Sequence, residues 1–282
     1  EADGENPFCC VISVEPPHPP FEVPEELEEK WLDEEIELPP NFRSEKHLEV
    51  EPAAAGLDLD DSETRHKVIR DRKLYYGMVE NLDDNVGRLM GFLEEKGLAE
   101  ETIVMLVADH GELNGSHGLR SKQYPYEESI GIPLIFTGPG VASGKSIEDP
   151  VCTEDLFPTL LGLAGIEPGG DPPGEDLSPL VQGHQQGLDR PGVLLQFVWE
   201  WRQYMPFQDQ MWRGYRSRRY KYTALGGMNE AQPWQFFDLQ EDPFELNNLI
   251  DDPEARDLVR QHDGWMRERI NEVGDEFPET FD

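Results

Sequence analysis

Residues that can bind metals and anions cluster directly after an apolar run in the middle of the chain. Five of them fall within fourteen positions: Asp109, His110, Glu112, His117 and Lys122. An aspartate beside a histidine offers a carboxylate oxygen and an imidazole nitrogen to a divalent cation, and a lysine can face an anion. Gly111 allows the backbone to turn sharply between them. The spacing therefore predicts a metal and anion site.

The same pattern also fits an ordinary surface turn. In that alternative Asp109 caps the loop, while His117 and Lys122 are simply solvated. The local pattern favours neither alternative, because polar clusters at strand ends also occur without a function. Evidence from more distant segments has to decide between them.

Three apolar runs predict the strands that would position these residues. Residues 8–14, 103–108 and 132–136 are continuously apolar, which is typical of strands buried on both faces of a parallel sheet. A helix is expected from Ser62 to about Lys96, giving a strand, helix, strand crossover. Ligands bind at the carboxyl ends of strands in such α/β sheets. The chain is therefore expected to be an α/β protein with a mostly parallel sheet.

A histidine follows the first apolar run in an unusual setting. Residues 15–21 place four prolines around His18, which holds it in a stiff, extended segment. A lone loop histidine is more often without a function. Because this one follows a predicted strand, we expect His18 to lie at the same sheet edge as Asp109 and Lys122.

The C-terminal third changes character after residues 168–191, which are rich in glycine and proline. Short aromatic segments then predict a small antiparallel sheet with strands near 193–198, 212–217, 220–223 and 235–239. A helix is expected over residues 253–273. We therefore predict an α/β domain over 1–167, a linker over 168–191 and a small subdomain over 192–282. The arginines of this region are expected to pair with carboxylates: Arg213, Arg216, Arg218 and Arg219.

The composition is strongly acidic, with 59 Asp and Glu against 24 Lys and Arg and a formal net charge of -35. This charge argues against nucleic acid as a partner. No apolar run approaches the roughly 18 residues of a membrane span. Three cysteines cannot form a closed disulfide framework, and the adjacent Cys9 and Cys10 are expected to be small buried residues. Because the chain begins with Glu1 just before a predicted strand, we expect it to be part of a longer protein.

Several separated segments carry a family likeness. They are, in chain order, residues 17–21 around His18, YYGMVENLDDNVGRL at 75–89, ADHGE at 108–112, SHG at 116–118 with Lys122, RYKY at 219–222 and FDLQEDPFELNNL at 237–249. Together they resemble the sulfatase family of the alkaline-phosphatase-like superfamily, over nearly the whole chain and in order. The resemblance implies an α/β/α sandwich, partial in this chain, with a small antiparallel C-terminal subdomain.

The resemblance also implies a role for each matching residue. Asp109 and His110 would be the third and fourth protein ligands of Ca²⁺ or another divalent cation, and Lys122 would hold a sulfate oxygen. His18, beside the ester oxygen, and His117, near the pocket, would be catalytic residues together with Lys122. The chemistry is consistent, because a cation and a lysine stabilise charge on sulfate oxygens and a histidine can protonate the departing oxygen.

The attacking group of the family is missing from this chain. In the family it is a hydrated formylglycine, made from the cysteine of a Cys-x-Pro-Ser-Arg motif, and none of Cys9, Cys10 and Cys152 lies in such a motif. The family's early pair of metal-binding aspartates is also absent. We therefore expect a C-terminal fragment of a hydrolase that cleaves small-molecule or carbohydrate sulfate esters, and we expect the fragment alone to be inactive.

Two other functions stay open at this stage. Phosphonate and phosphodiester hydrolases of the same superfamily place similar residues around a metal. A non-catalytic, sulfatase-like binding protein would share the fold without a nucleophile. The sequence upstream of Glu1 separates these alternatives, because a Cys-x-Pro-Ser-Arg motif there would indicate a sulfatase.

The acidic, lysine-poor composition predicts a dependence on salt. At molar ionic strength the Debye length is about 3 Å, so the repulsion among carboxylates is screened. Dialysis from molar to low salt is therefore expected to unfold a protein adapted to a halophilic setting, as followed by circular dichroism. Full retention of the folded signal in dilute buffer would contradict this expectation.

Overall fold

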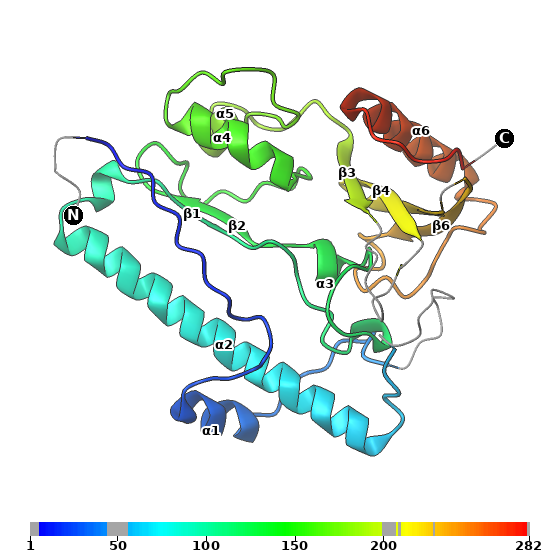
Figure 1. Ribbon diagram of the computed structural model, residues 1–282, viewed down its shortest axis with the longest axis horizontal. Coiled ribbons are helices and arrows are strands. Elements are labelled where there is room, and N and C mark those ends of the chain that lie inside the picture. The colour runs from blue at the N-terminus through cyan, green and yellow to red at the C-terminus, as the bar shows by residue number, and fades with distance from the viewer. Residues whose placement is uncertain (1–5, 44–55, 199–206, 208–209, 228, 281–282) are drawn as a thin grey trace. The chain divides into compact units, whose positions relative to one another are not determined.

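The computed structural model describes residues 6–43, 56–198, 207, 210–227 and 229–280 (Figure 1). Contacts divide the chain into two compact units. The first unit comprises Glu1–Glu37 and Ser62–Leu98, and the second comprises Leu38–Asp61 and Ala99–Asp282. Among the described residues, no helix combines the length and the apolar character that a membrane crossing needs.

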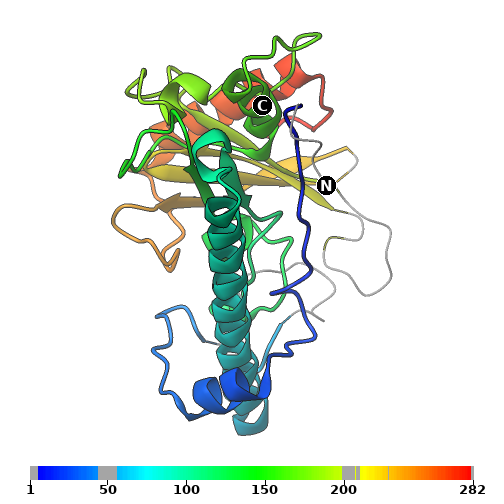
Figure 2. The same cartoon turned by 90° about the vertical axis from the view of Figure 1, so that its left-hand side faces the viewer.

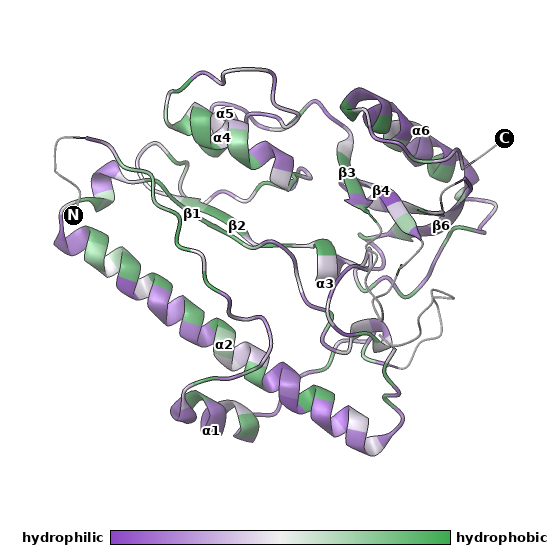
Figure 3. Ribbon diagram, in the orientation of Figure 1, coloured by the Kyte–Doolittle hydropathy of each residue, from purple (hydrophilic) through white to green (hydrophobic). Residues whose placement is uncertain are grey.

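The first unit is built on two helices, α1 (Glu25–Asp33) and α2 (Ser62–Glu95), which pack against each other (Figure 2). Gly77 lets them approach closely, because a Cβ atom there would lie 3.0 Å from the Trp31 ring. The Lys30 ammonium and the Trp31 indole both donate hydrogen bonds to Glu80, at 2.7 Å each. Apolar residues recur along α2 between stretches of polar residues, as expected for a helix with one apolar face (Figure 3). The predicted long helix is confirmed.

Residues 8–14 do not form the predicted buried strand. Their backbone has no regular secondary structure, and their side chains are exposed, with Val11 at 85%. Cys9 and Cys10 are exposed as well, so their expected burial is wrong. An apolar run shows that a segment can be buried, but a strand also needs a hydrogen-bonded neighbour. Since no described segment pairs with residues 8–14, the expected strand, helix, strand crossover is not formed.

The second unit begins with two short strands, β1 (Val104–Val107) and β2 (Leu134–Thr137). They pair antiparallel, with Val104 opposite Thr137, so the parallel arrangement expected for them is wrong. The physical reason is the connection between them. It contains only a 3-10 turn, η3 (Ser116–Gly118), and a four-residue helix, α3 (Glu127–Ile130), and no long crossover helix returns the chain to its starting end.

The C-terminal antiparallel sheet is confirmed. Its strands lie in the order β3 (Gly192–Phe197), β4 (Met211–Ser217), β5 (Tyr220–Gly226) and β6 (Ala231–Asp238), and every pair is antiparallel. The predicted last helix, α6 (Arg256–Val273), packs on this sheet (Figure 1). The predicted arginine pairing is also confirmed, with one carboxylate for each side chain: Arg213 with Asp275, Arg216 with Glu127, Arg218 with Asp149 and Arg219 with Asp238.

Two apolar cores lie against this sheet. One joins it to α6 and contains Tyr222, Phe236 and Met266, all fully buried. The other packs Trp212 and Phe237 of the sheet against residues from the segment between β1 and α3, which include Leu113 and Tyr126. That segment contains His117 and Lys122, so the C-terminal sheet supports the loop in which sequence analysis placed the site.

Between the two sheets the chain forms η4 (Thr153–Asp155), α4 (Leu156–Leu163) and α5 (Ser178–Val181). A helical segment thus begins at Thr153. Arg190 donates two hydrogen bonds to the fully buried Asp155 carboxylate, which ties this region to the start of β3. The domain division at residues 168–191 stays a prediction.

Acid is expected to weaken the C-terminal sheet through His262, which lies 2% exposed beneath it. Its Nδ1 bonds to the Leu258 carbonyl at 2.8 Å and its Nε2 to the Ser217 hydroxyl at 2.9 Å. Burial lowers the pKa of His262, so the unfolded chain binds the proton more tightly. Its stabilising contribution is full above the ordinary histidine pKa of about 6.5 and is lost as the pH falls below that value.

The measurement is urea unfolding of the wild type and of His262→Gln at about pH 7.5 and about pH 5.5. The wild type is expected to lose more free energy of unfolding on acidification than the variant does. His66→Gln, which changes an exposed histidine, serves as the control. Equal losses in the wild type and His262→Gln would contradict the prediction.

Candidate functional site

Asp109 and His110 follow β1 and place an oxygen and a nitrogen side by side. The Asp109 side chain is 87% exposed, and its Oδ2 lies 3.5 Å from His110 Nε2. His110 Nδ1 lies 2.8 Å from the Gly111 carbonyl, so it carries the proton and leaves the Nε2 lone pair available. A backbone carbonyl on the second ring nitrogen is the usual support of a metal-binding histidine. The two side chains therefore fit one divalent cation.

Gly111 anchors this pair to α3. Its N–H donates to the Ser129 carbonyl at 2.8 Å. A Cβ atom at position 111 would lie 2.1 Å from the Glu128 carbonyl oxygen, so no other residue fits without a backbone shift. From the sequence, Gly111 was expected only to allow a sharp turn. In the structure its backbone also packs directly against the Glu128 carbonyl. It fixes where the chain turns after Asp109.

Lys122 lies between two residues with left-handed backbone, Ser121 at φ 67° and Gln123 at φ 86°. The Ser121 N–H donates to Glu112 Oε1 at 2.6 Å, and the Trp212 indole N–H donates to the Gln123 carbonyl at 2.8 Å. The Lys122 side chain is half-buried, and within the described ranges it makes no hydrogen bond or ion pair. Its backbone is thus held on both sides, and its ammonium is not paired with a described carboxylate.

His117 lies in a different environment from Lys122. Its side chain is 1% exposed, and its ring stacks on Tyr126 with centroids 3.7 Å apart. Its Nε2 lies 3.1 Å from Asn41 Nδ2 and 3.9 Å from the Glu128 carboxylate. Such burial favours support of the loop over contact with a substrate. The catalytic role expected for His117 stays a prediction.

The His117, Glu128 and Glu245 side chains offer ligand atoms within 4.8 Å of one another, a spacing that could hold a metal. The groups around them argue against a cation. The Asn41 amide already donates to Glu128 at 2.5 Å, and the buried Lys221 ammonium lies 2.5 Å from Glu245. The Lys221 ammonium thus compensates the Glu245 carboxylate, and the Asn41 amide occupies one oxygen of Glu128. We interpret the cluster as a polar core and favour Asp109 and His110 as metal ligands.

A buried charge network joins α3 to the C-terminal sheet. Lys221, with no exposed surface, pairs with Glu245 and with Glu127, and Arg216 also pairs with Glu127. Burial opposes ionisation of Glu127, but the Lys221 and Arg216 charges outweigh it, so the pKa of Glu127 is lowered. The more deeply buried Glu245 has a raised pKa, because desolvation dominates there. Glu245 also accepts the Glu127 N–H at 2.7 Å, which caps the start of α3.

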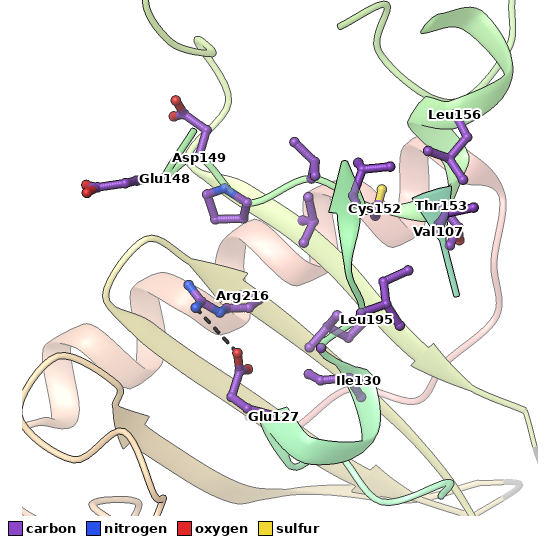
Figure 4. A pocket seen from close by; sticks show the side chains of 16 residues that line it. Val107, Glu127, Ile130, Glu148, Asp149, Cys152, Thr153, Leu156, Leu195 and Arg216 are labelled. Carbon is purple, nitrogen blue, oxygen red and sulfur yellow. Dashed lines mark hydrogen bonds and ion pairs between the residues drawn. The ribbon is translucent and has the colours of Figure 1, made fainter. Parts of the chain in front are cut away.

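A cavity of about 230 Å³ lies beside this network. Its wall is apolar at Val107, Ile130 and Leu195, and the ion pair of Arg216 with Glu127 forms its polar side (Figure 4). None of the five predicted site residues lines it. The cavity is therefore separate from the predicted metal and anion site.

His18 belongs to the first compact unit, and the other predicted site residues belong to the second. Its side chain is exposed, and its Nδ1 lies 2.7 Å from the Pro19 carbonyl. The hydrogen bond orients the ring within the proline-rich segment. The expected convergence of His18 with Lys122 stays a prediction.

Sequence reasoning missed three residues that support the site: Asn41, Trp212 and Glu245. Asn41 lies in the acidic, proline-rich excursion after α1, and Glu245 in a loop after β6. No local pattern singles them out, because each acts on a segment more than 75 positions away. The sole signal was the aromatic character of the segment around Trp212, which indicated a core.

Comparison with known proteins gives two family matches that overlap along the chain. Residues 1–166 match the family model Sulfatase, and residues 115–273 match the model N-sulphoglucosamine sulphohydrolase, C-terminal. The ulvan-active sulfatase of Formosa agariphila is 29% identical over 98% of this chain and 50% of its own length. This chain thus spans about half the length of the curated relatives it matches.

Solved structures show the same fold. The protein yidJ of Bacteroides fragilis superposes with a TM-score of 0.79 at 25% identity, covering 97% of this chain and 56% of the other. A phosphonate monoester hydrolase from Silicibacter pomeroyi gives a TM-score of 0.63 at 26% identity, over 76% of this chain and 44% of the other. The predicted α/β fold class with its C-terminal antiparallel sheet is confirmed.

Breaking the buried pair of Lys221 with Glu245 is expected to destabilise the protein strongly. Lys221→Met leaves a buried carboxylate without its cation, which costs about 3–5 kcal/mol of unfolding free energy. Combining it with Glu245→Gln removes the charge and keeps an oxygen for the Glu127 N–H, so part of the loss is recovered. Lys30→Met breaks a half-exposed ion pair and is the control, with little change expected. Urea unfolding measures all four proteins, and a double variant no more stable than Lys221→Met would contradict the prediction.

Proposed function

This chain belongs to the sulfatase family, and we propose from that premise that the protein containing it hydrolyses sulfate monoesters. The single observation that carries the proposal is the loop from Asp109 to Lys122. It presents a carboxylate and an imidazole side by side at one end and a lysine with a tethered backbone at the other. This combination suits an anionic group held against a cation.

We propose Asp109 and His110 as two ligands of Ca²⁺ or another divalent cation. His110 Nε2 and Asp109 Oδ2 supply the donor atoms, and the Gly111 carbonyl fixes the histidine tautomer. When bound, such a cation draws electron density from the sulfate oxygens and lowers the cost of charge rearrangement. The remaining ligands are expected in a segment outside these residues.

Lys122 and His18 are proposed to act on the substrate directly. The Lys122 ammonium would hold a sulfate oxygen and balance its charge through bond cleavage. In its doubly protonated form, His18 would donate the Nε2 proton to the departing ester oxygen, while its Nδ1–H stays bonded to the Pro19 carbonyl. His117 would act behind them by supporting the loop.

The nucleophile is proposed to be a formylglycine supplied outside these residues, because the chain has no Cys-x-Pro-Ser-Arg motif. A hydrated formylglycine supplies a hydroxyl group that can attack sulfur. The 282 residues alone are therefore proposed to be inactive. As the substrate class we propose small-molecule or carbohydrate sulfate esters, supported by the likeness to a Delta 4,5-hexuronate-2-O-sulfatase of Bacteroides thetaiotaomicron, which is 28% identical over 97% of this chain.

A second function has its own support. The likeness to a phosphonate monoester hydrolase at 26% identity favours phosphonate or phosphodiester hydrolysis as the alternative. A non-catalytic binding protein is the third candidate. Such a protein would bind sulfate without catalysing hydrolysis.

Steady-state kinetics of the intact protein with an aryl sulfate, a phosphodiester and a phosphonate ester test the proposal. The aryl sulfate is expected to give the highest kcat/KM. Lys122→Ala is expected to lower kcat/KM by about 10²–10³-fold, as the loss of one charge-stabilising donor does. Lys145→Ala removes an exposed lysine of the same compact unit and is the matched control.

Separate measurements test the metal and the fragment. Asp109→Ala is expected to weaken calcium binding in a calorimetric titration, and the isolated 282 residues are expected to show no aryl sulfate turnover. Higher turnover of the phosphonate or phosphodiester would favour the second function. Absence of turnover together with intact sulfate binding would favour the binding protein.

A further inference from the structure

The peptide groups on either side of Lys122 are held by side chains from two distant parts of the fold. On one side, Glu112 Oε1 accepts the Ser121 N–H at 2.6 Å and the Asn114 N–H at 3.3 Å. The Leu113 N–H donates to the Ser121 carbonyl at 2.9 Å, which closes the loop at the same point. One carboxylate oxygen thus joins the segment after His110 to the residue before Lys122.

On the other side, the anchor comes from the C-terminal sheet. Trp212 of β4 donates its indole N–H to the Gln123 carbonyl at 2.8 Å. Its ring is 3% exposed and stacks on Phe197, with centroids 6.1 Å apart. A ring that is buried and packed in this way has little room to change position. The donor is therefore a fixed point on a rigid element.

The backbone between the two anchors is unusual. Ser121 and Gln123 are both left-handed, a conformation that few residues other than glycine adopt. Such residues persist only where the surroundings hold them, and they concentrate at functional sites. Here the two left-handed residues flank the one residue of the loop proposed to bind the anion.

We infer that Glu112 and Trp212 are positioning residues for Lys122, clamping the peptide groups on its two sides so that its ammonium is presented to the sulfate group. The inference rests on the proposed function, in which Lys122 binds that group. Neither residue has to touch the substrate. Glu112 acts through Ser121 and Trp212 acts through Gln123.

Binding of inorganic sulfate to the calcium-loaded intact protein tests the clamp by calorimetry. Glu112→Ala and Trp212→Phe are each expected to weaken sulfate binding by about 3–10-fold, the loss of part of a charged contact. Glu112→Gln keeps an oxygen for the Ser121 N–H and is expected to change the Kd by less than about twofold. The controls are Glu100→Ala, at an exposed position, and Trp265→Phe, in α6.

A double-mutant cycle distinguishes positioning of Lys122 from general support of the fold. In a Lys122→Ala background, Glu112→Ala and Trp212→Phe are expected to cause no further loss of sulfate affinity. Equal losses with and without Lys122 would overturn the inference. So would unchanged binding in both single variants when Lys122→Ala itself weakens binding.

Failure of the proposed function gives a different result. If Lys122→Ala leaves sulfate binding unchanged, Lys122 is not the anion ligand and the proposed function loses its basis. Hydrogen exchange at the Ser121 amide then still tests the clamp, because Glu112→Ala should raise its exchange rate and Glu112→Gln should not. If Glu112→Ala does not fold, the double-mutant cycle is measured with Trp212→Phe and Lys122→Ala. An unchanged exchange rate in a folded Glu112→Ala would overturn the clamp.

Discussion

The candidate site depends on one mechanical constraint: a loop with little regular structure of its own must be held by a sheet formed more than 60 residues later in the chain. The loop between β1 and α3 has no strand or long helix to stiffen it. Its rigidity comes from the buried contacts of Trp212 with Gln123 and from the charges around Lys221. An unpaired buried charge or donor would be costly, so these contacts tend to form together or not at all. The C-terminal sheet therefore supports the loop that contains the predicted site.

Sequence patterns predicted some parts of this structure and missed others. Asp109, His110 and Lys122 could be proposed from sequence, because their chemistry is unusual and their spacing is short. The long helix and the four C-terminal strands could be found too, since their periodicity is local. Asn41, Glu245 and Trp212 could not be assigned, because their roles exist only after the chain has folded. The strand predicted at residues 8–14 was wrong. Their composition is typical of a strand, but no described segment pairs with them.

The overall charge sets a problem that the local arrangement has to solve. A chain with a formal charge of -35 repels anions at long range, so the attraction for the proposed sulfate ester must come from groups close to the anion. Most arginines of the C-terminal sheet are already committed to carboxylates. Lys122 differs from them in being a lysine without such a partner among the described residues. In an acidic protein, the proposed cation and the Lys122 ammonium would together make a local positive field.

The exposed apolar segment at residues 8–14 has a consequence for colloidal behaviour. An extended apolar segment with unpaired backbone groups can add to the edge of a sheet in another molecule. At low ionic strength the mutual repulsion of the carboxylates keeps molecules apart, and at molar salt that barrier shrinks to a few ångströms. Salt that screens the repulsion among carboxylates within each molecule thus also permits contact between molecules. Solubility of this chain would then pass through a maximum at intermediate salt, set by the balance of the two effects.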